Sequence, residues 1–268
     1  MNLPESSLIE PRFLDAGEAA LVVEFGLAVD PAINDHVLAL ERALAALALP
    51  GVRETVPTFR SLMIHYDPLV IDRATLVERV RGLETQPAPP RAAVRWTVPC
   101  CYEPPWGEDV AQIATLAGLT PERVVALHTS TELRVYMYGF VPGFCYLGRL
   151  PELAISRRAS VRAPHPPNTV LVADSMCVIT TVNMPTGWWL IGRTPERLFA
   201  PAREPTFLVG VGDALRFAAI DRASFDALEA RAAAGELVAK RERLALARRS
   251  SCAPPARRSA CRMPAASA

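Results

Sequence analysis

The spacing of apolar residues changes along the chain from helical to strand-like, and this change divides it into two regions. In residues 1–86, apolar side chains at helical spacing predict amphipathic helices over residues 31–48 and 73–84. Short apolar runs predict strands at Leu21–Phe25, Val52–Phe59 and Leu62–Tyr66. The order of these elements predicts a small ferredoxin-like α/β layer, with both helices on one face of an antiparallel sheet.

Residues 91–220 read mainly as β-structure. Two short helices are predicted over residues 108–117 and 121–129, and Thr120-Pro121-Glu122 is typical of a helix N-terminus. The predicted strands are Val94–Val98, Leu133–Tyr138, Thr169–Ala173, Cys177–Val182, Trp188–Ile191, Thr206–Val209 and Ala214–Ala219. Short strands separated by proline and glycine are typical of a sandwich or barrel, so the predicted fold class is α+β.

Two boundaries follow from composition. Gln86-Pro87-Ala88-Pro89-Pro90 predicts an extended linker, because its prolines bar a helix. Residues 221–246 are predicted to form a long charged helix after the barrel. Large apolar residues almost disappear beyond it, so we expect residues 247–268 to be a disordered tail.

Charge and targeting signals narrow the class of protein. The 268 residues are 50% hydrophobic and carry a formal net charge of +1, which argues against nucleic acid or an anionic membrane as the main partner. No apolar stretch reaches the roughly 20 residues of a membrane span, and Met1–Pro11 lacks the apolar region of a secretory signal. We therefore expect a cytoplasmic protein.

Lysine is almost absent, which excludes several chemistries. Of the 29 basic residues only Lys240 is lysine, and it falls in the predicted charged helix. A P-loop, a Schiff-base enzyme and a biotin carrier each need a lysine in a specific place. We therefore expect no biotin on this chain, and any bound anion to be held by arginine, backbone N–H groups or a metal.

Cysteine and histidine give no metal motif. The six cysteines include no CxxC pair and are interpreted as reduced, mostly buried thiols. His36 and His65 are interpreted as structural residues. His128 ends a predicted helix, where capping alone would explain it, although a functional role stays open. His165 lies in a proline-rich loop that could reach a cleft. No metal is expected.

One loop stands out between the predicted strands. Residues 136–148 combine five aromatic residues with three glycines and a proline. Such a loop suits a ligand that approaches the backbone, and it suits a well-packed turn equally well. Arginines surround it in sequence, and their planar forks pair with carboxylate or phosphate. These arginines are Arg134, Arg149, Arg157, Arg158, Arg162 and Arg193.

Several motifs in this order resemble one known family. They are Leu14–Gly26, Pro57–Leu62, His65–Pro68, Leu127-His128, Arg134–Phe144, Tyr146–Gly148 and Gly187–Pro195. Together they resemble carboxyltransferase domain subfamily 1, which is also known as allophanate hydrolase subunit 1, the B-type subunit of 5-oxoprolinase and the sporulation kinase inhibitor. The similarity runs from about residue 12 to 220.

The resemblance implies a fold, partners and an activity. The fold would be a small α/β layer followed by a cyclophilin-like β-barrel. The partners would be a second carboxyltransferase-domain subunit, of subfamily 2, and a lactam-utilisation-type subunit. The activity would be ATP-dependent hydrolysis of 5-oxoproline to glutamate. ATP would be bound by the complex, and not necessarily by this chain.

The expected function is therefore that of a hydrolase subunit that is inactive without its partners. Its catalytic residues are unassigned, because no nucleophile or base is obvious. The expected binding residues are Arg134, Gly139, Pro142, Gly143, Phe144, Arg158 and Arg193, with His128 a weaker candidate. They would line half of a pocket that another polypeptide completes, around the glycine-bent loop.

Two other functions in the family stay open. One is the carboxyltransferase half of a biotin-dependent urea or amide carboxylase, and the other is inhibition of a histidine kinase. Residues 165–187 depart from the family pattern, because they lack its glycine-rich stretch and carry Met184-Pro185-Thr186-Gly187-Trp188 in place of a Pro-Gly-Gly-Trp turn. That departure leaves the identity of the substrate, and the activity of this member, open.

Overall fold

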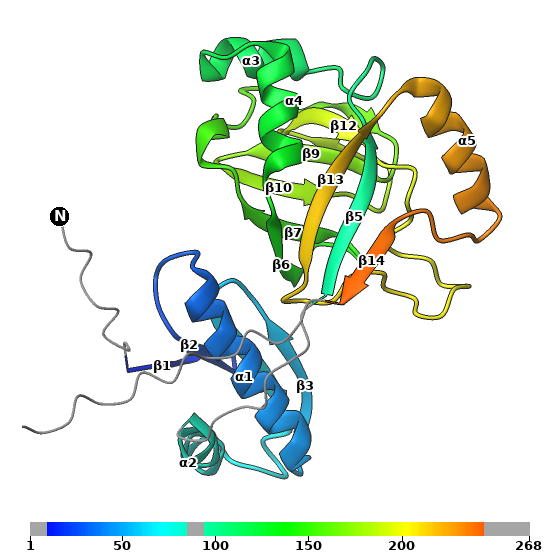
Figure 1. Cartoon of the computed structure of the whole chain (residues 1–268). Coiled ribbons are helices and arrows are strands. Elements are labelled where there is room, and N and C mark those ends of the chain that lie inside the picture. Colours follow the sequence, from blue (N-terminus) through cyan, green and yellow to red (C-terminus); the bar gives the residue numbers. More distant parts are fainter. Residues whose placement is uncertain (1–9, 85–93, 244–268) are drawn as a thin grey trace, which may run out of the picture.

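The computed structural model describes residues 10–84 and 94–243, which form an N-terminal α/β layer and a β-barrel (Figure 1). The elements of the layer are β1 (Arg12–Asp15), β2 (Ala20–Glu24), α1 (Pro31–Leu47), β3 (Val52–Pro57), β4 (Ser61–Tyr66) and α2 (Arg73–Glu84). Its four strands form an antiparallel sheet in the order β1-β2-β4-β3. The predicted linker and the predicted tail lie outside the described residues.

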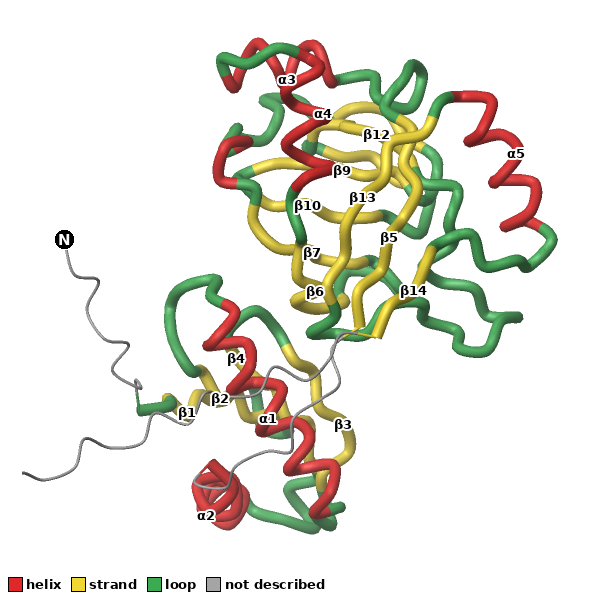
Figure 2. Tube along the Cα trace, in the orientation of Figure 1, coloured by secondary structure: helices red, strands yellow, loops and turns green. Residues whose placement is uncertain are grey.

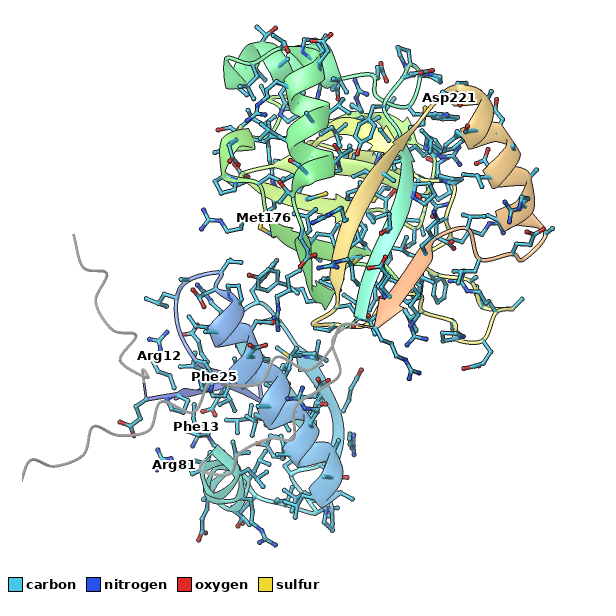
Figure 3. All side chains as sticks on the ribbon, in the orientation of Figure 1. Arg12, Phe13, Phe25, Arg81, Met176 and Asp221 are labelled. Atoms are coloured by element: carbon cyan, nitrogen blue, oxygen red, sulfur yellow. The ribbon has the colours of Figure 1, made fainter. Side chains whose placement is uncertain are left out.

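The layer is held by one apolar core. Alternate residues of β2 and β4, such as Leu21 and Ile64, are fully buried against Val37 of α1 and Leu76 of α2. Asp30 begins α1, because its carboxylate accepts a hydrogen bond from the Ala32 backbone N–H at 2.7 Å. At the rim, the Arg81 guanidinium lies over the Phe13 ring, and both side chains are labelled in Figure 3. The predicted α/β layer is confirmed, with β1 as a strand that the sequence pattern did not predict.

The barrel follows in a longer series of elements. They are β5 (Val94–Cys101), α3 (Val110–Ala117), α4 (Pro121–Ser130), β6 (Leu133–Tyr138), β7 (Cys145–Arg149), the 3₁₀ helix η1 (Pro151–Leu153), β8 (Arg162–His165), β9 (Thr169–Ala173), β10 (Met176–Ile179), β11 (Met184–Thr186), β12 (Trp189–Arg193), β13 (Ala214–Ile220), α5 (Arg222–Ala233) and β14 (Lys240–Arg243). Seven strands run in the order β12-β9-β10-β7-β6-β13-β5, and pairing of β12 with β5 closes them into the expected barrel (Figure 2).

The seam where β12 meets β5 leaves no room for a side chain at Gly192. A Cβ atom there would lie 2.7 Å from the Cys100 Sγ and 2.7 Å from the Cys101 carbonyl oxygen. We expect Gly192→Ala to lower the free energy of unfolding by about 2–3 kcal/mol, because overpacked cores shift backbone to relieve such contacts. Urea unfolding measures this loss. Gly187→Ala is the control, since a Cβ there meets nothing within 4 Å and should change stability by less than about 0.5 kcal/mol.

Two predicted elements are wrong in extent. The charged helix predicted over residues 221–246 ends as α5 at Ala233, because Gly235 takes a left-handed φ of 93° and residues 240–243 then pair with β5 as β14. Lys240 therefore lies on a strand. The strand predicted at Thr206–Val209 is reduced to a single bridge between Phe199 and Phe207, because Pro201 and Pro205 in the connection between them have no backbone N–H to donate.

A polar and aromatic contact joins the layer to the barrel. The Arg134 guanidinium on β6 donates to the Asn34 side-chain oxygen at 2.9 Å and to the Asp35 carboxylate at 2.6 Å. Phe59 packs against Tyr136 with ring centroids 5.4 Å apart. Arg134 therefore holds the start of α1 against the barrel. Within residues 10–84 and 94–243, no helix has the length and apolar character of a membrane span.

Candidate functional site

A cavity of about 380 Å³ opens beside β8, between this strand and the loop that joins β5 to α3. Its lining residues are Pro105, Trp106, Glu108, Arg162, Ala163, Pro164, His165, Pro166, Thr169 and Leu190. Proline and tryptophan rings supply apolar walls, while one carboxylate, one guanidinium and one imidazole supply polar groups. A few polar groups on a mostly apolar wall are typical of a site for a small ligand.

Asp109, directly behind the wall, organises the positive charges of the site. Its side chain is 4% exposed and accepts from the Leu190 backbone N–H at 2.8 Å. It also accepts from the Nη2 of Arg162 at 3.0 Å and pairs with the Nη1 of Arg158 at 3.5 Å. A buried carboxylate fixes two guanidiniums in this way, because leaving either charge unpaired in the interior would be costly.

His165 at the end of β8 supplies a base, a role for which no residue was obvious from the sequence. Its Nδ1 lies 3.1 Å from the Pro166 carbonyl oxygen, which can only accept, so Nδ1 carries the proton. The Nε2 atom is then a lone-pair acceptor, and it is buried without a hydrogen-bond partner in the described part of the chain. Burial lowers the pKa of His165 below its usual 6.5, so the ring is neutral at neutral pH. A neutral imidazole whose Nε2 lone pair is unused can accept a proton from a donor that comes within hydrogen-bond distance.

Other unpartnered polar atoms belong to residues that line the same cavity or pair with Asp109 behind it. Within the described residues, buried side-chain nitrogens without a hydrogen bond include Trp106 Nε1, Arg158 Nε and Arg162 Nε. Buried polar groups are nearly always paired, and unpaired ones mark sites where a ligand or water completes the set. The three donors and the His165 acceptor therefore favour this cavity as the functional site.

The sequence-predicted arginines separate into two places. Arg158 pairs with Asp109 behind the cavity and lies over the Trp189 ring at 4.6 Å. Arg193 lies over the Trp106 ring at 4.4 Å and pairs with Glu229 of α5 at 2.7 Å. Both therefore border the cavity without lining it. Arg134 lies instead at the contact between the layer and the barrel, so the three arginines do not converge on the loop as expected.

The glycine-bent loop is a packed corner of the barrel. The Gly143 φ is 75°, and a Cβ there would lie 2.4 Å from the Phe199 Cβ, so only glycine fits. Phe144 is buried in a small cluster with Leu171, Val178 and Leu190. Gly139 and Pro142 lie in the same turn, where the Pro142 carbonyl accepts from the Thr181 hydroxyl at 2.7 Å. These loop residues do not line the cavity, whereas Leu190 of β12, which packs in the same cluster as Phe144, does.

His128 is a core residue. It is fully buried, with its Nδ1 2.7 Å from the Tyr102 hydroxyl, its Nε2 3.5 Å from the Cys177 Sγ and its ring stacked on Phe217. Burial lowers the pKa of His128 to about 3. No group of three or more His, Cys, Asp or Glu side chains in the described ranges is arranged to hold a metal ion.

The neutral His128 predicts acid sensitivity of folding. Between pH 6.5 and 3 the unfolded chain binds a proton that the folded chain does not, so the free energy of unfolding falls as the pH is lowered, by about 1.4 kcal/mol per pH unit. Urea unfolding between pH 7 and 5 measures this slope. The double variant Tyr102→Phe/His128→Phe removes both hydrogen-bond partners together, and its slope should be shallower by that amount. An unchanged slope would show that His128 is not the group that titrates.

The segment that departs from the family pattern contributes one side of the cavity. His165, Pro166 and Thr169 line it, and Asn168 takes a left-handed φ of 64°, a conformation that asparagine tolerates. Further along, Asp174 and Ser175 form the left-handed turn between β9 and β10. Arg162 and His165 were noticed in the sequence without being selected. Trp106 and Asp109 follow Pro104-Pro105, and this proline–tryptophan loop was the signal that could have found them.

Sequence comparison places the chain in a family. The model of the carboxyltransferase domain, subdomains C and D, matches residues 11–209. A protein from Bacillus subtilis that is named as the B-type subunit of 5-oxoprolinase is 30% identical over 79% of this chain and 93% of its own length. Another with the same name, from Escherichia coli O157:H7, is 34% identical over 75% of this chain and 92% of its own.

Solved structures agree on the fold. A crystal structure of TTHA0988 superposes with a TM-score of 0.68 at 33% identity over 75% of this chain, which spans only 40% of TTHA0988. The Kluyveromyces lactis urea carboxylase superposes with a TM-score of 0.72 over 90% of this chain and 25% of its own, at 17% identity, and so shares the fold. The matched residues include both the layer and the strands that form the cavity, and the chain therefore belongs to the carboxyltransferase domain C and D family.

Proposed function

We propose that this chain is the B-type subunit of a 5-oxoprolinase complex, and that the cavity beside β8 is its share of the site for 5-oxoproline. The cavity is the observation on which the proposal rests, because it combines an arginine and an unpartnered imidazole nitrogen with apolar walls made of tryptophan and proline rings. The proposal is supported by the relatives named as this subunit of 5-oxoprolinase, which the chain matches over more than nine-tenths of their length.

The chemistry of the cavity suits a small cyclic amide with a carboxylate. The Arg162 guanidinium pairs with the carboxylate, and the ring of 5-oxoproline packs against Trp106 and the prolines. His165 Nε2 accepts a proton from the water that attacks the lactam carbonyl carbon and returns it to the ring nitrogen as the C–N bond breaks. That carbon becomes the side-chain carboxyl of glutamate, and the nitrogen becomes its amino group. Lactam hydrolysis without activation is slow, so ATP would transfer its γ-phosphoryl group to the carbonyl oxygen, and a second water would release it as phosphate with ADP as the other product.

The residues around the cavity do not fit a nucleoside triphosphate. The lining residues include a single guanidinium, that of Arg162, which the substrate carboxylate takes up, and they include no lysine for a chain of phosphates. Lys240, on β14, pairs in register with Thr97 of β5. We therefore assign ATP to a partner subunit, either the second carboxyltransferase-domain chain or the lactam-utilisation-type chain.

Reconstitution tests this function. The chain is co-expressed with those two partner subunits, and glutamate and ADP are measured after addition of 5-oxoproline and ATP. We expect glutamate and ADP in equal amounts from the complete complex, and none when this chain is left out. A complete complex that forms no glutamate, or partners that form it equally well alone, would contradict the proposal.

A further inference from the structure

Arg162 makes two unequal ion pairs at the edge of the cavity. Its Nη2 donates to Asp109, whose side chain is 4% exposed, and its Nη1 donates at 2.8 Å to Glu108, whose side chain is 59% exposed. An exposed pair is weak, because water screens it and the free carboxylate keeps its hydration. A buried pair is difficult to break, because it would leave an unpaired charge in the interior.

The Asp109 and Glu108 carboxylates therefore have different roles at Arg162. Asp109 is held in place by the Leu190 backbone N–H as well as by the arginines, so it fixes the guanidinium. The Glu108 carboxylate instead lines the cavity itself, where its bond to Arg162 is exposed to water. The Glu108 carboxylate can leave Arg162 while the bonds of Asp109 to Arg162 and to Leu190 stay in place.

We propose that Glu108 occupies the carboxylate position of the site in the free chain, and that the carboxylate of an incoming ligand displaces it from Arg162. The exchange conserves charge, because one carboxylate replaces another on the same guanidinium. Ligand selection follows: an anionic ligand takes the place of Glu108, whereas a neutral one leaves the Glu108 pair intact. Only the identification of the ligand as 5-oxoproline rests on the proposed function; the exchange at Arg162 does not.

A second observation supports ligand binding at this position. The Arg162 Nε atom is buried and has no hydrogen-bond partner in the described residues, although the other two nitrogens of the guanidinium are paired. The Trp106 Nε1 atom, on the opposite lining segment, is unpartnered in the same way. Glu108 therefore satisfies only part of the donor set, and a ligand with more acceptors satisfies more of it.

The full chain tests the exchange by ¹H–¹⁵N NMR of its arginine Nε–H groups. The Arg162 signal is assigned by its loss in Arg162→Lys. Acetate, 5-oxoproline and 2-pyrrolidinone are then titrated into the unmodified chain and into Glu108→Gln. Glu152→Gln, which removes a charge from an exposed residue that does not line the cavity, is the matched control.

We expect acetate and 5-oxoproline to shift the Arg162 signal, and 2-pyrrolidinone, which lacks a carboxylate, to leave it unchanged. Glu108→Gln should tighten binding of both anions about two- to fivefold, the range set by the strength of an exposed ion pair, and Glu152→Gln should not. Equal affinities in the unmodified chain and in Glu108→Gln, or no shift with either anion, would overturn the exchange. If acetate follows the expected pattern and the complex makes no glutamate, the exchange stands and the proposed function fails.

Discussion

In the reconstituted complex, His165→Asn is expected to lower kcat for glutamate formation by about 100-fold, the lower end of the contribution of a general base. Asparagine retains a donor near the position of Nδ1 for the Pro166 carbonyl, but it has no group at the position of Nε2. The change therefore removes the buried acceptor while keeping the local hydrogen bond. The measurement is the steady-state rate of glutamate release at saturating ATP and 5-oxoproline.

The pH profile separates a base from a structural residue. Because burial lowers the pKa of His165, the neutral and active form persists at neutral pH, and the rate should fall only as the pH drops through that lowered pKa. His165→Asn should lose this acidic limb as well as the rate. His36→Asn, on α1 of the layer, is the control and should retain both. An unchanged rate and profile in His165→Asn would exclude His165 as the base.

Replacement of Asp109 should produce the largest loss of stability. Asp109→Ala leaves the Arg158 and Arg162 guanidiniums without their shared buried carboxylate, and it also frees the Leu190 backbone N–H. Breaking a buried pair by removing one partner lowers the free energy of unfolding by about 3–5 kcal/mol. Urea unfolding of the full chain measures this loss.

Glu108→Ala provides the matched comparison, because it removes the other carboxylate from the same arginine. Its pair is exposed, so the loss should stay below about 1 kcal/mol. Similar losses in the two variants would mean that Asp109 does not anchor the site. The comparison of the two variants isolates the effect of burial, because Glu108 and Asp109 are adjacent carboxylates that pair with the same arginine.

Local pattern was sufficient for most of the secondary structure. The helix over residues 31–48 and the strands around it were predictable because their apolar residues fill one side of an amphipathic element, as Val37 and Ile64 do in the layer core. The extent of α5 was not predictable in this way. Gly235 turns the chain back, and the open edge of β5 then pairs with residues 240–243, a contact that depends on distant sequence.

The site was harder to predict than the fold. Arginines near the glycine-bent loop in sequence need not lie near it in space, and Arg134 pairs with the layer while Arg158 and Arg193 border the cavity. Asp109 bonds to Leu190 of β12, and His165 lies shortly before β9. The two residues come to the same cavity because β12 pairs with β9. Spacing along the chain carries no signal of that contact.

The most direct test of the site is the KM for 5-oxoproline in the assembled complex with Arg162→Lys. Lysine keeps a positive charge opposite Asp109 but loses the guanidinium fork, so KM should rise about 10-fold or more while the complex still assembles. Arg157→Lys is the control, because the Arg157 side chain is 62% exposed on the same segment and pairs only loosely, at 3.7 Å, with Asp174. An Arg162→Lys complex with the unmodified KM would show that 5-oxoproline does not bind beside β8.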